Sequence, residues 1–243
     1  MLAPSGDAWF CKAWSNGIPR DFTKNPVDPY DSRFLTGRLP SKLSIDGKGT
    51  ATIYDNTRIF VSGSWLNTET TIYVFVPSST SGVISIRSRS NHETRCGFGD
   101  YVTIYELAGT ECECRTRKEP VHPIYVGNVS IKSYTFPLDK WVGLKSICRN
   151  VGNDKVLSQG YIDYGDHRWV KMTEYIDEGD WPGTPETDTE LWDKAKDCVG
   201  KEDNIPENMR RPFMGRGKHC WVRCDVNGII KLNYFSVIEI TPA

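Results

Sequence analysis

Three segments read VISIRSRSNH at residues 83–92, YVTIYEL at 101–107 and ECECRTRKE at 111–119, and together they indicate the fold. Each segment alternates in character, and successive side chains of a β-strand point to opposite faces of a sheet. In the first segment Ile84 and Ile86 point one way. Arg87, Arg89 and Asn91 point the other way. The period of two therefore predicts a strand with one face to bury and one polar face.

The second and third segments repeat this division. Val102 and Ile104 form one side of the second segment, and Tyr101 and Tyr105 lie opposite. In the third segment, glutamates and arginines alternate with cysteines and Thr116. Three successive strands with this pattern predict a sheet whose exposed face carries arginines, phenol rings and carboxylates. This face is the site that the sequence favours.

The rest of the chain also reads as short strands separated by turns. β-branched and aromatic residues predict strands at residues 43–45, 50–54, 58–61, 70–76, 141–149, 155–164, 168–176, 220–226 and 229–240. Asp46-Gly47-Lys48-Gly49 predicts a hairpin, and Asn227-Gly228 between alternating apolar residues predicts another. The strands at 141–176 should form a meander. Along 141–149, Val142, Leu144 and Cys148 share one face, and Trp141, Lys145 and Arg149 lie on the opposite face. This pattern predicts an all-β jelly roll, a β-sandwich of two antiparallel sheets.

At 243 residues, the chain has the length of one large β-domain. Residues 1–40 lack a sustained period and predict an extended N-terminal arm that packs on the domain. Residues 177–210 form a long irregular insertion that begins with an acid-rich run and can include a short helix at 189–198. We therefore expect a single jelly-roll domain, 1–243, with an arm and an acidic loop insertion.

The charge balance limits the classes of partner. The formal net charge is −1, so no global field draws the chain to nucleic acid or to a membrane surface. No apolar run approaches the roughly 18 residues of a spanning helix. No basic leader of the signal-peptide type is visible at the N-terminus. Any positive site must therefore be local.

Eight cysteines are distributed along the chain: Cys11, Cys96, Cys112, Cys114, Cys148, Cys198, Cys220 and Cys224. An even count in a turn-rich chain is typical of a secreted protein with disulfides, and buried free thiols are the alternative. The spacings do not match a zinc site. We expect no cofactor, although acid-rich loops near Asp28 and Asp177 offer oxygen ligands for a structural Ca²⁺.

The polar faces can serve one ligand class in particular. Arginine forks bind carboxylates in bidentate geometry, and tyrosine rings pack on sugar faces, so the surface suits an acidic polysaccharide. The alternative is that the arginines only pair with acids of the same sheet, such as Asp100 and Glu113. The substrate-binding candidates are Arg87, Arg89, Asn91, Tyr105, Arg115, Arg117, Lys118, Glu119 and Tyr125, joined from the meander by Lys145 and Gln159.

Several of these segments together resemble a known family. The residues are Arg87-Ser-Arg-Ser-Asn-His92, the following Tyr101, Lys118-Glu119 with His122 and Tyr125, and Trp141-Val-Gly-Leu-Lys145. They resemble polysaccharide lyases of the concanavalin-like jelly-roll type, in particular alginate and glucuronan lyases. The resemblance is one of pattern and spans residues 58–240.

This resemblance implies β-elimination across the glycosidic bond of a uronic acid. Arg87, Arg89 and Asn91 would neutralise the substrate carboxylate and stabilise the enolate-like charge at the reacting carbon. A base would remove the proton at C5, and an acid would protonate the leaving oxygen. The resemblance implies a histidine and a tyrosine in these roles: His92 or His122 as base, and Tyr101 or Tyr161 as acid.

Three other functions fit the same sequence. A non-catalytic carbohydrate-binding module or lectin would use the same face without a converging His and Tyr. A glycoside hydrolase would require two facing carboxylates, for which Glu111/Glu113 and Glu174/Asp177 are the nearest pairs. A structural jelly roll would carry an apolar contact patch instead of a polar groove.

Overall fold

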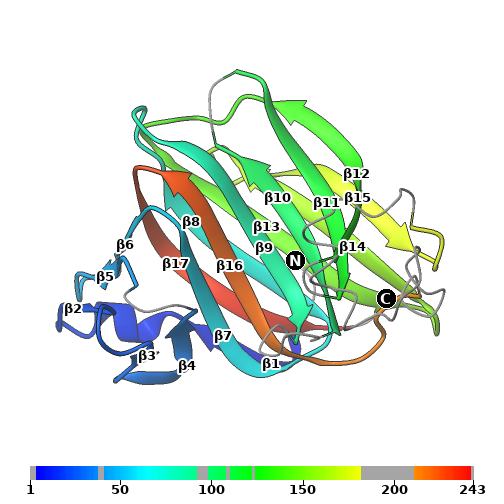
Figure 1. Cartoon of the computed structure of the whole chain (residues 1–243), viewed down its shortest axis with the longest axis horizontal. Coiled ribbons are helices and arrows are strands. Elements are labelled where there is room, and N and C mark those ends of the chain that lie inside the picture. Colours follow the sequence, from blue (N-terminus) through cyan, green and yellow to red (C-terminus); the bar gives the residue numbers. More distant parts are fainter. Residues whose placement is uncertain are drawn as a thin grey trace.

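The computed structural model describes residues 4–37, 41–91, 98–107, 110–121, 124–181 and 211–241. Two antiparallel sheets, sheet A and sheet B, form the two layers of a sandwich (Figure 1). Sheet A runs in the order β15 (Trp169–Asp177), β14 (Lys155–Asp163), β13 (Trp141–Val151), β8 (Thr68–Phe75), β17 (Ile229–Ile240), β6 (Ala51–Tyr54), β5 (Leu43–Ile45) and β2 (Arg20–Asp21). Sheet B runs in the order β12 (Ile124–Tyr134), β11 (Cys112–Val121), β10 (Phe98–Glu106), β9 (Ser81–Ser90), β16 (Gly217–Asn227), β7 (Thr57–Trp65), β4 (Asp31–Thr36) and β3 (Val27–Asp28).

This architecture confirms the predicted all-β sandwich. The meander β13–β14–β15 and the hairpin β5–β6 pair as expected. The apolar strand β8 lies inside sheet A, between β13 and β17, which are distant from each other in the sequence. Such non-local neighbours are typical of jelly rolls, whose Greek-key connections bring together strands that are distant in the sequence.

The core lies between the two sheets. Ile84 and Ile86 of β9 face it, as their alternation predicts, and Leu144 of β13 faces it from sheet A. Thr103 of β10 and Ser146 of β13 share a hydrogen bond of 2.8 Å across the layers. The side chains at the alternate positions of each sheet therefore form two outer faces.

The predicted hairpin at Asn227-Gly228 is wrong. β16 belongs to sheet B and β17 to sheet A, so this turn carries the chain from one layer to the other. A type I′ hairpin turn needs positive φ at both central residues. Gly228 has a φ of 126°, but Asn227 is not among the residues with positive φ.

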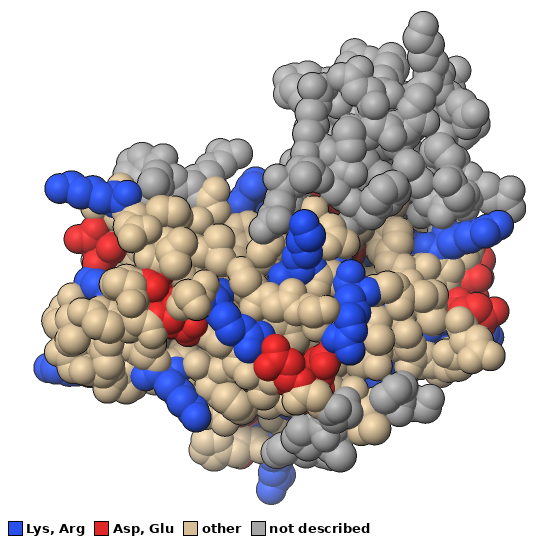
Figure 2. Space-filling model, turned by 90° about the horizontal axis from the view of Figure 1, so that it is seen from below, with Lys and Arg blue, Asp and Glu red and all other residues tan. Residues whose placement is uncertain are grey.

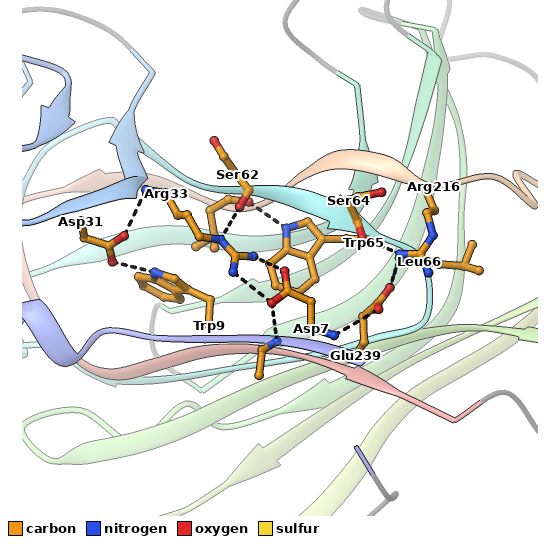
Figure 3. A network of polar contacts seen from close by, with 12 residues as sticks. Asp7, Trp9, Asp31, Arg33, Ser62, Ser64, Trp65, Leu66, Arg216 and Glu239 are labelled. Carbon is orange, nitrogen blue, oxygen red and sulfur yellow. Dashed lines mark hydrogen bonds and ion pairs between the residues drawn. The ribbon is translucent and has the colours of Figure 1, made fainter. Parts of the chain in front are cut away.

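The N-terminal segment is fastened to the sandwich by strand pairing and by charges (Figure 3). β1 (Pro4–Phe10) pairs with β17, and a 3-10 helix, η1 (Lys12–Ser15), follows. Arg33 of β4 donates to both oxygens of Asp7, at 3.1 and 2.7 Å, and its guanidinium lies 4.8 Å from the Trp65 ring centroid. Glu239 of β17 accepts from the Asp7 backbone N–H and from Arg216. β1 is thus fixed to both sheets.

The predicted disulfides are wrong for five of the cysteines, which match the alternative of free thiols. Cys11, Cys114, Cys148, Cys220 and Cys224 are free, and all but Cys11 are buried. A disulfide among them is therefore excluded. Burial raises the pKa of the Cys114 and Cys220 thiols to about 12, which keeps them protonated. Cys96 and Cys198 lie outside the described residues.

The insertion predicted at 177–210, with its short helix, lies outside the described residues from 182 onward, and the single-domain division remains a prediction. Among the residues that the structure does describe, no helix is both long and apolar enough to span a membrane. No group of three or more His, Cys, Asp or Glu in that part of the chain is arranged to hold a metal ion. Asp28 and Asp177, which belong to the acid-rich stretches that offer oxygen ligands, pair with the cations Arg20 and Lys118.

Candidate functional site

The residues predicted from β9, β10 and β11 do not share one exposed face. Arg87 lies on the outer face of sheet B, opposite Val102 of β10 and Trp221 of β16. Tyr101 and Tyr105 point the other way, into the space between the sheets, and both are buried. The prediction of one exposed face that carries both the arginines and the tyrosines is therefore wrong. Alternation gives two faces, but it does not say which face is turned inward.

Arg87 belongs to a buried charge cluster. Its Nη1 lies 3.2 Å from Asp100 and also contacts Glu119 on the neighbouring strand. The guanidinium is 4.6 Å from the centroid of the Trp221 ring, and Arg87 is 4% exposed. The ion pairs of this cluster therefore fit the alternative, in which the arginines pair with acids of the same sheet, better than they fit a substrate site.

Arg89 leaves the face of Arg87 because the strand is distorted at this residue. Its φ is 59°, which breaks the alternation. The side chain donates to the carbonyl oxygens of Leu66 at 2.7 Å and Phe213 at 2.5 Å, and it is 1% exposed. Asn91, one residue beyond the strand, accepts from the backbone N–H of Lys218. Neither side chain therefore forms an exposed polar face together with Arg87.

Lys118 and Tyr101 meet inside the sandwich. The Lys118 Nζ and the Tyr101 hydroxyl each lie 2.6 Å from the same Oδ2 of Asp177, at the end of β15. Burial lowers the pKa of Lys118 and, together with Asp177, raises that of Tyr101 well above its ordinary value. Tyr105 donates to the Lys145 carbonyl oxygen at 2.6 Å. The predicted proton donor Tyr101 therefore has no access to a polysaccharide.

The remaining predicted residues fall into three groups. Arg115 and Arg117 lie on the outer face of sheet B, where Arg115 pairs with Glu106 and Glu113, and Glu119 lies there with Arg87. The histidines His92 and His122 are outside the described residues, and Tyr125 lies in β12, which is described without this side chain. Lys145, Gln159 and Tyr161 lie on the outer face of sheet A. The cations are thus dispersed, and Figure 2 shows blue and red side chains intermixed on the face seen from below.

The outer face of sheet A contains a hollow of about 500 Å³, here called the groove. Four aromatic side chains line it: Tyr73 of β8, Trp141 of β13, Trp169 of β15 and Tyr234 of β17. The polar lining consists of Glu69, Thr71, Lys145, His167, Asn233 and Ser236, with Ile238 beside them. Lys145 is the one predicted site residue in this lining.

A row of paired residues across five strands builds the floor of the groove. Trp169, Asp163, Gly143, Tyr73 and Asn233 are successive cross-strand partners from β15 to β17. A Cβ at Gly143 would lie 2.7 Å from Trp169 Cη2 and 3.1 Å from Tyr73 Cζ. Only glycine leaves room there, and the two rings meet edge to face with centroids 6.1 Å apart. Tyr234 also meets Tyr73 edge to face, at 5.9 Å.

One ion pair lies in the groove. The Lys145 Nζ is 2.8 Å from Glu69 and 4.4 Å from the centroid of the Trp169 ring. Both side chains are about one-tenth exposed, at 10% and 11%. The two charges balance, so the pair provides hydrogen-bonding groups to a ligand without a large net field.

Asp163 fixes one rim of the groove. Its Oδ2 accepts from the Tyr73 hydroxyl at 2.8 Å, and its Oδ1 accepts from the backbone N–H groups of Gly165, Asp166 and His167. This turn places the exposed His167 at the rim. Burial and the Asp163 carboxylate raise the pKa of Tyr73 far above its ordinary value, so Tyr73 is a hydrogen-bonding and stacking group rather than a base.

The sequence held partial signals for this site. The alternation of 141–149 correctly predicts that Trp141 and Lys145 share a face opposite Val142 and Leu144. Trp169 and Tyr234 were missed, because their proximity depends on the sheet order and on the β14–β15 turn. Tyr161 and Gln159 share the outer face with Lys145, since Tyr161 is its cross-strand partner. Gln159 donates to Glu174 at the edge of that face.

No family model and no curated protein matches this chain. Solved structures with a similar fold include a protein of unknown function with a galectin-like fold from Bacillus subtilis, with 10% identity, 100% of both chains covered and a TM-score of 0.52. They also include a mutant of alginate lyase Aly36B in complex with alginate tetrasaccharide (9% identity, 97% and 98% covered, 0.49) and the carbohydrate-binding module CBM66 from Bacillus subtilis (11%, 85% and 96%, 0.46). At 10% identity, the likeness to the galectin-like structure shows the fold alone. The chain folds as a β-sandwich of the jelly-roll type, similar to that structure.

Proposed function

We propose that this protein binds a carbohydrate in the groove on sheet A. The observation that carries the proposal is the set of Tyr73, Trp141, Trp169 and Tyr234 around one hollow, each at least partly exposed. Exposed aromatic side chains gathered at one place on a soluble protein mark a binding site. Small-molecule sites are typically concave and rich in aromatic residues, with a few placed polar groups.

The chemistry of a sugar ring matches this lining. Its axial hydrogens form an apolar face that packs on an aromatic ring, and its hydroxyl groups need hydrogen-bond donors and acceptors at the edges. Glu69 and Asn233 offer acceptors, and Lys145 offers donors, beside the rings of Trp169 and Tyr73. The floor is preorganised because Asp163 and Gly143 hold these rings in place. Preorganisation lowers the entropy lost on binding.

Titration calorimetry against a panel of polysaccharides tests this proposal. The panel is alginate, polyglucuronate, pectate and hyaluronan, with xylan, mannan and β-glucan as neutral polymers. We expect at least one to bind, and Trp169→Ala to weaken that binding by roughly 30-fold, as for a central aromatic contact. Tyr30→Ala is the matched control, because Tyr30 is 51% exposed and does not line the groove. Absence of binding, or equal effects of both variants, would refute the proposal.

A second candidate is a polysaccharide lyase acting on an acidic polymer. The specific observation in its favour is that Lys145 and Tyr161 are cross-strand partners on the outer face, with His167 at the rim. Lys145 would neutralise the uronate carboxylate, His167 would take the proton from C5, and Tyr161 would protonate the oxygen that leaves as the glycosidic bond breaks. Burial raises the pKa of Tyr161, which suits an acid that must stay protonated. The test is the ultraviolet absorbance of the unsaturated product with the four acidic polymers, and Tyr161→Phe should abolish it.

A further inference from the structure

We infer that the ligand is a carbohydrate chain that occupies two subsites, one on each side of Tyr234. This inference deepens the proposed function and depends on it. A second hollow of about 310 Å³ adjoins the groove, and Tyr234, Asn233 and Ser236 line both. On its far side the second hollow is lined by Phe10, Lys12 and Ser15 from β1 and η1. The two hollows therefore lie side by side on sheet A, with Tyr234 between them.

Tyr234 has an unusual backbone at the boundary between the hollows. Its φ is 50°, in a region that non-glycine residues rarely adopt, and the pairing of β17 with β8 shifts register between Asn233 and Ser236. Asn233 supports this conformation, because its Oδ1 accepts from the Tyr234 N–H at 2.6 Å. Residues held in such conformations cluster at binding sites. The bulge leaves Tyr234 59% exposed.

The two sides of Tyr234 offer similar chemistry. Tyr73 stands on the groove side, with the two rings nearly perpendicular at 85°. On the other side Phe10 is 39% exposed, and the Lys12 Nζ lies 5.9 Å from its ring centroid. Each side thus combines an aromatic platform with a cationic amine that can donate to sugar hydroxyls.

Hydrogen bonds and burial hold the wall of the second hollow in place. The Cys11 N–H donates to the Phe235 carbonyl oxygen at 3.0 Å, and the Phe235 N–H lies 3.2 Å from the Cys11 Sγ. The adjacent Trp14 is 1% exposed, and β1 is tied to Arg33 through Asp7. A fixed wall can serve as a subsite without ordering a loose arm on binding.

Calorimetry with oligosaccharides of one to six units tests this inference, with alginate, cello-, xylo- and manno-oligosaccharide series as the probes. We expect the affinity to rise at least tenfold between the shortest ligand that binds and the length that reaches both hollows. Phe10→Ala should remove this gain and leave the shortest ligand unaffected. Trp169→Ala should weaken every length.

Ser15→Trp provides a second variant, because Ser15 is exposed and its new indole would fill the second hollow. It should likewise weaken only the longer ligands. Length-independent affinity, or long-ligand binding that both variants leave unchanged, would overturn the two-subsite inference while the proposed function stands. If no series binds and no polymer of the panel binds, the proposed function and this inference both fail.

Discussion

The outer faces of the two sheets differ in how their polar side chains are placed. On sheet B, Arg87 is buried with Asp100, Glu119 and Trp221, so its charge is used within the fold. On sheet A, aromatic rings and one balanced ion pair, Lys145 with Glu69, surround an open hollow. A run of arginines in a strand is therefore weak evidence for a ligand when acids are its cross-strand neighbours. Exposed aromatic rings that converge from several strands are stronger evidence.

The largest expected effect concerns the charge cluster of sheet B. Arg87→Met removes the cation that lies between Asp100 and Glu119, both of which are 1% exposed. Removing one partner of a buried ion pair typically costs about 3–5 kcal/mol of stability. Chemical denaturation should therefore show a large loss of the free energy of unfolding. Unchanged stability together with lost glycan binding would assign Arg87 to a ligand site and would place the binding face on sheet B.

The next effect concerns the groove and should be seen in binding rather than in stability. Trp169 is half-buried on the outer face of sheet A, so Trp169→Ala removes a contact surface and little core. We expect roughly 30-fold weaker binding of the glycan selected in the panel, with a change in the free energy of unfolding below about 1 kcal/mol. Calorimetry and denaturation on the same sample measure both. A large stability loss would mean that Trp169 serves the fold.

A smaller effect is expected at the floor of the groove. Gly143→Ala places a methyl group 2.7 Å from Trp169 and 3.1 Å from Tyr73, so the two rings must move apart. Binding should weaken by roughly tenfold, as expected when a preorganised contact pair is displaced. Gly152→Ala is a control for adding a methyl group, because nothing lies within 4 Å of a Cβ there, although its φ of 69° adds backbone strain. Unchanged binding in Gly143→Ala would show that the edge-to-face geometry is not required.

The smallest effect is a pH dependence at the rim. Burial alone would raise the pKa of Asp163, but hydrogen bonds from Tyr73 and three backbone N–H groups outweigh it, so the pKa lies below 3.8. A depressed carboxyl pKa stabilises the fold above the unfolded-state value, and this stability is lost as pH falls through the folded-state pKa. The melting temperature of the wild type should therefore fall more steeply below about pH 4 than that of Asp163→Asn. Parallel curves would contradict this assignment.

The sequence could predict the strands and their alternation, but not which strand face is turned inward. In β10 both faces carry large side chains, Val102 and Ile104 on one and Tyr101 and Tyr105 on the other. The tyrosines fit between the sheets because the Tyr101 hydroxyl donates a hydrogen bond to Asp177 and the Tyr105 hydroxyl donates one to the Lys145 carbonyl oxygen. Hydrogen-bonded burial removes the cost of a polar group in the core. Alternation alone does not contain this information.

Two further features depend on long-range structure. The positive φ of Arg89 moves it to the opposite side of sheet B from Arg87, against the period of two. The groove requires β8 to lie between β13 and β17, because only then do Tyr73, Trp169 and Tyr234 converge. Strand order of this kind is set by the whole sandwich. Within one strand, however, the pattern of β13 placed Trp141 and Lys145 on the same face correctly.

A crystal structure of the protein soaked with the best-binding oligosaccharide of the length series would locate the ligand on the molecule. We expect sugar density on sheet A, packed on Trp169 and Tyr73 and extending past Tyr234 toward Phe10. Density on the outer face of sheet B, beside Arg87 and Trp221, would contradict it.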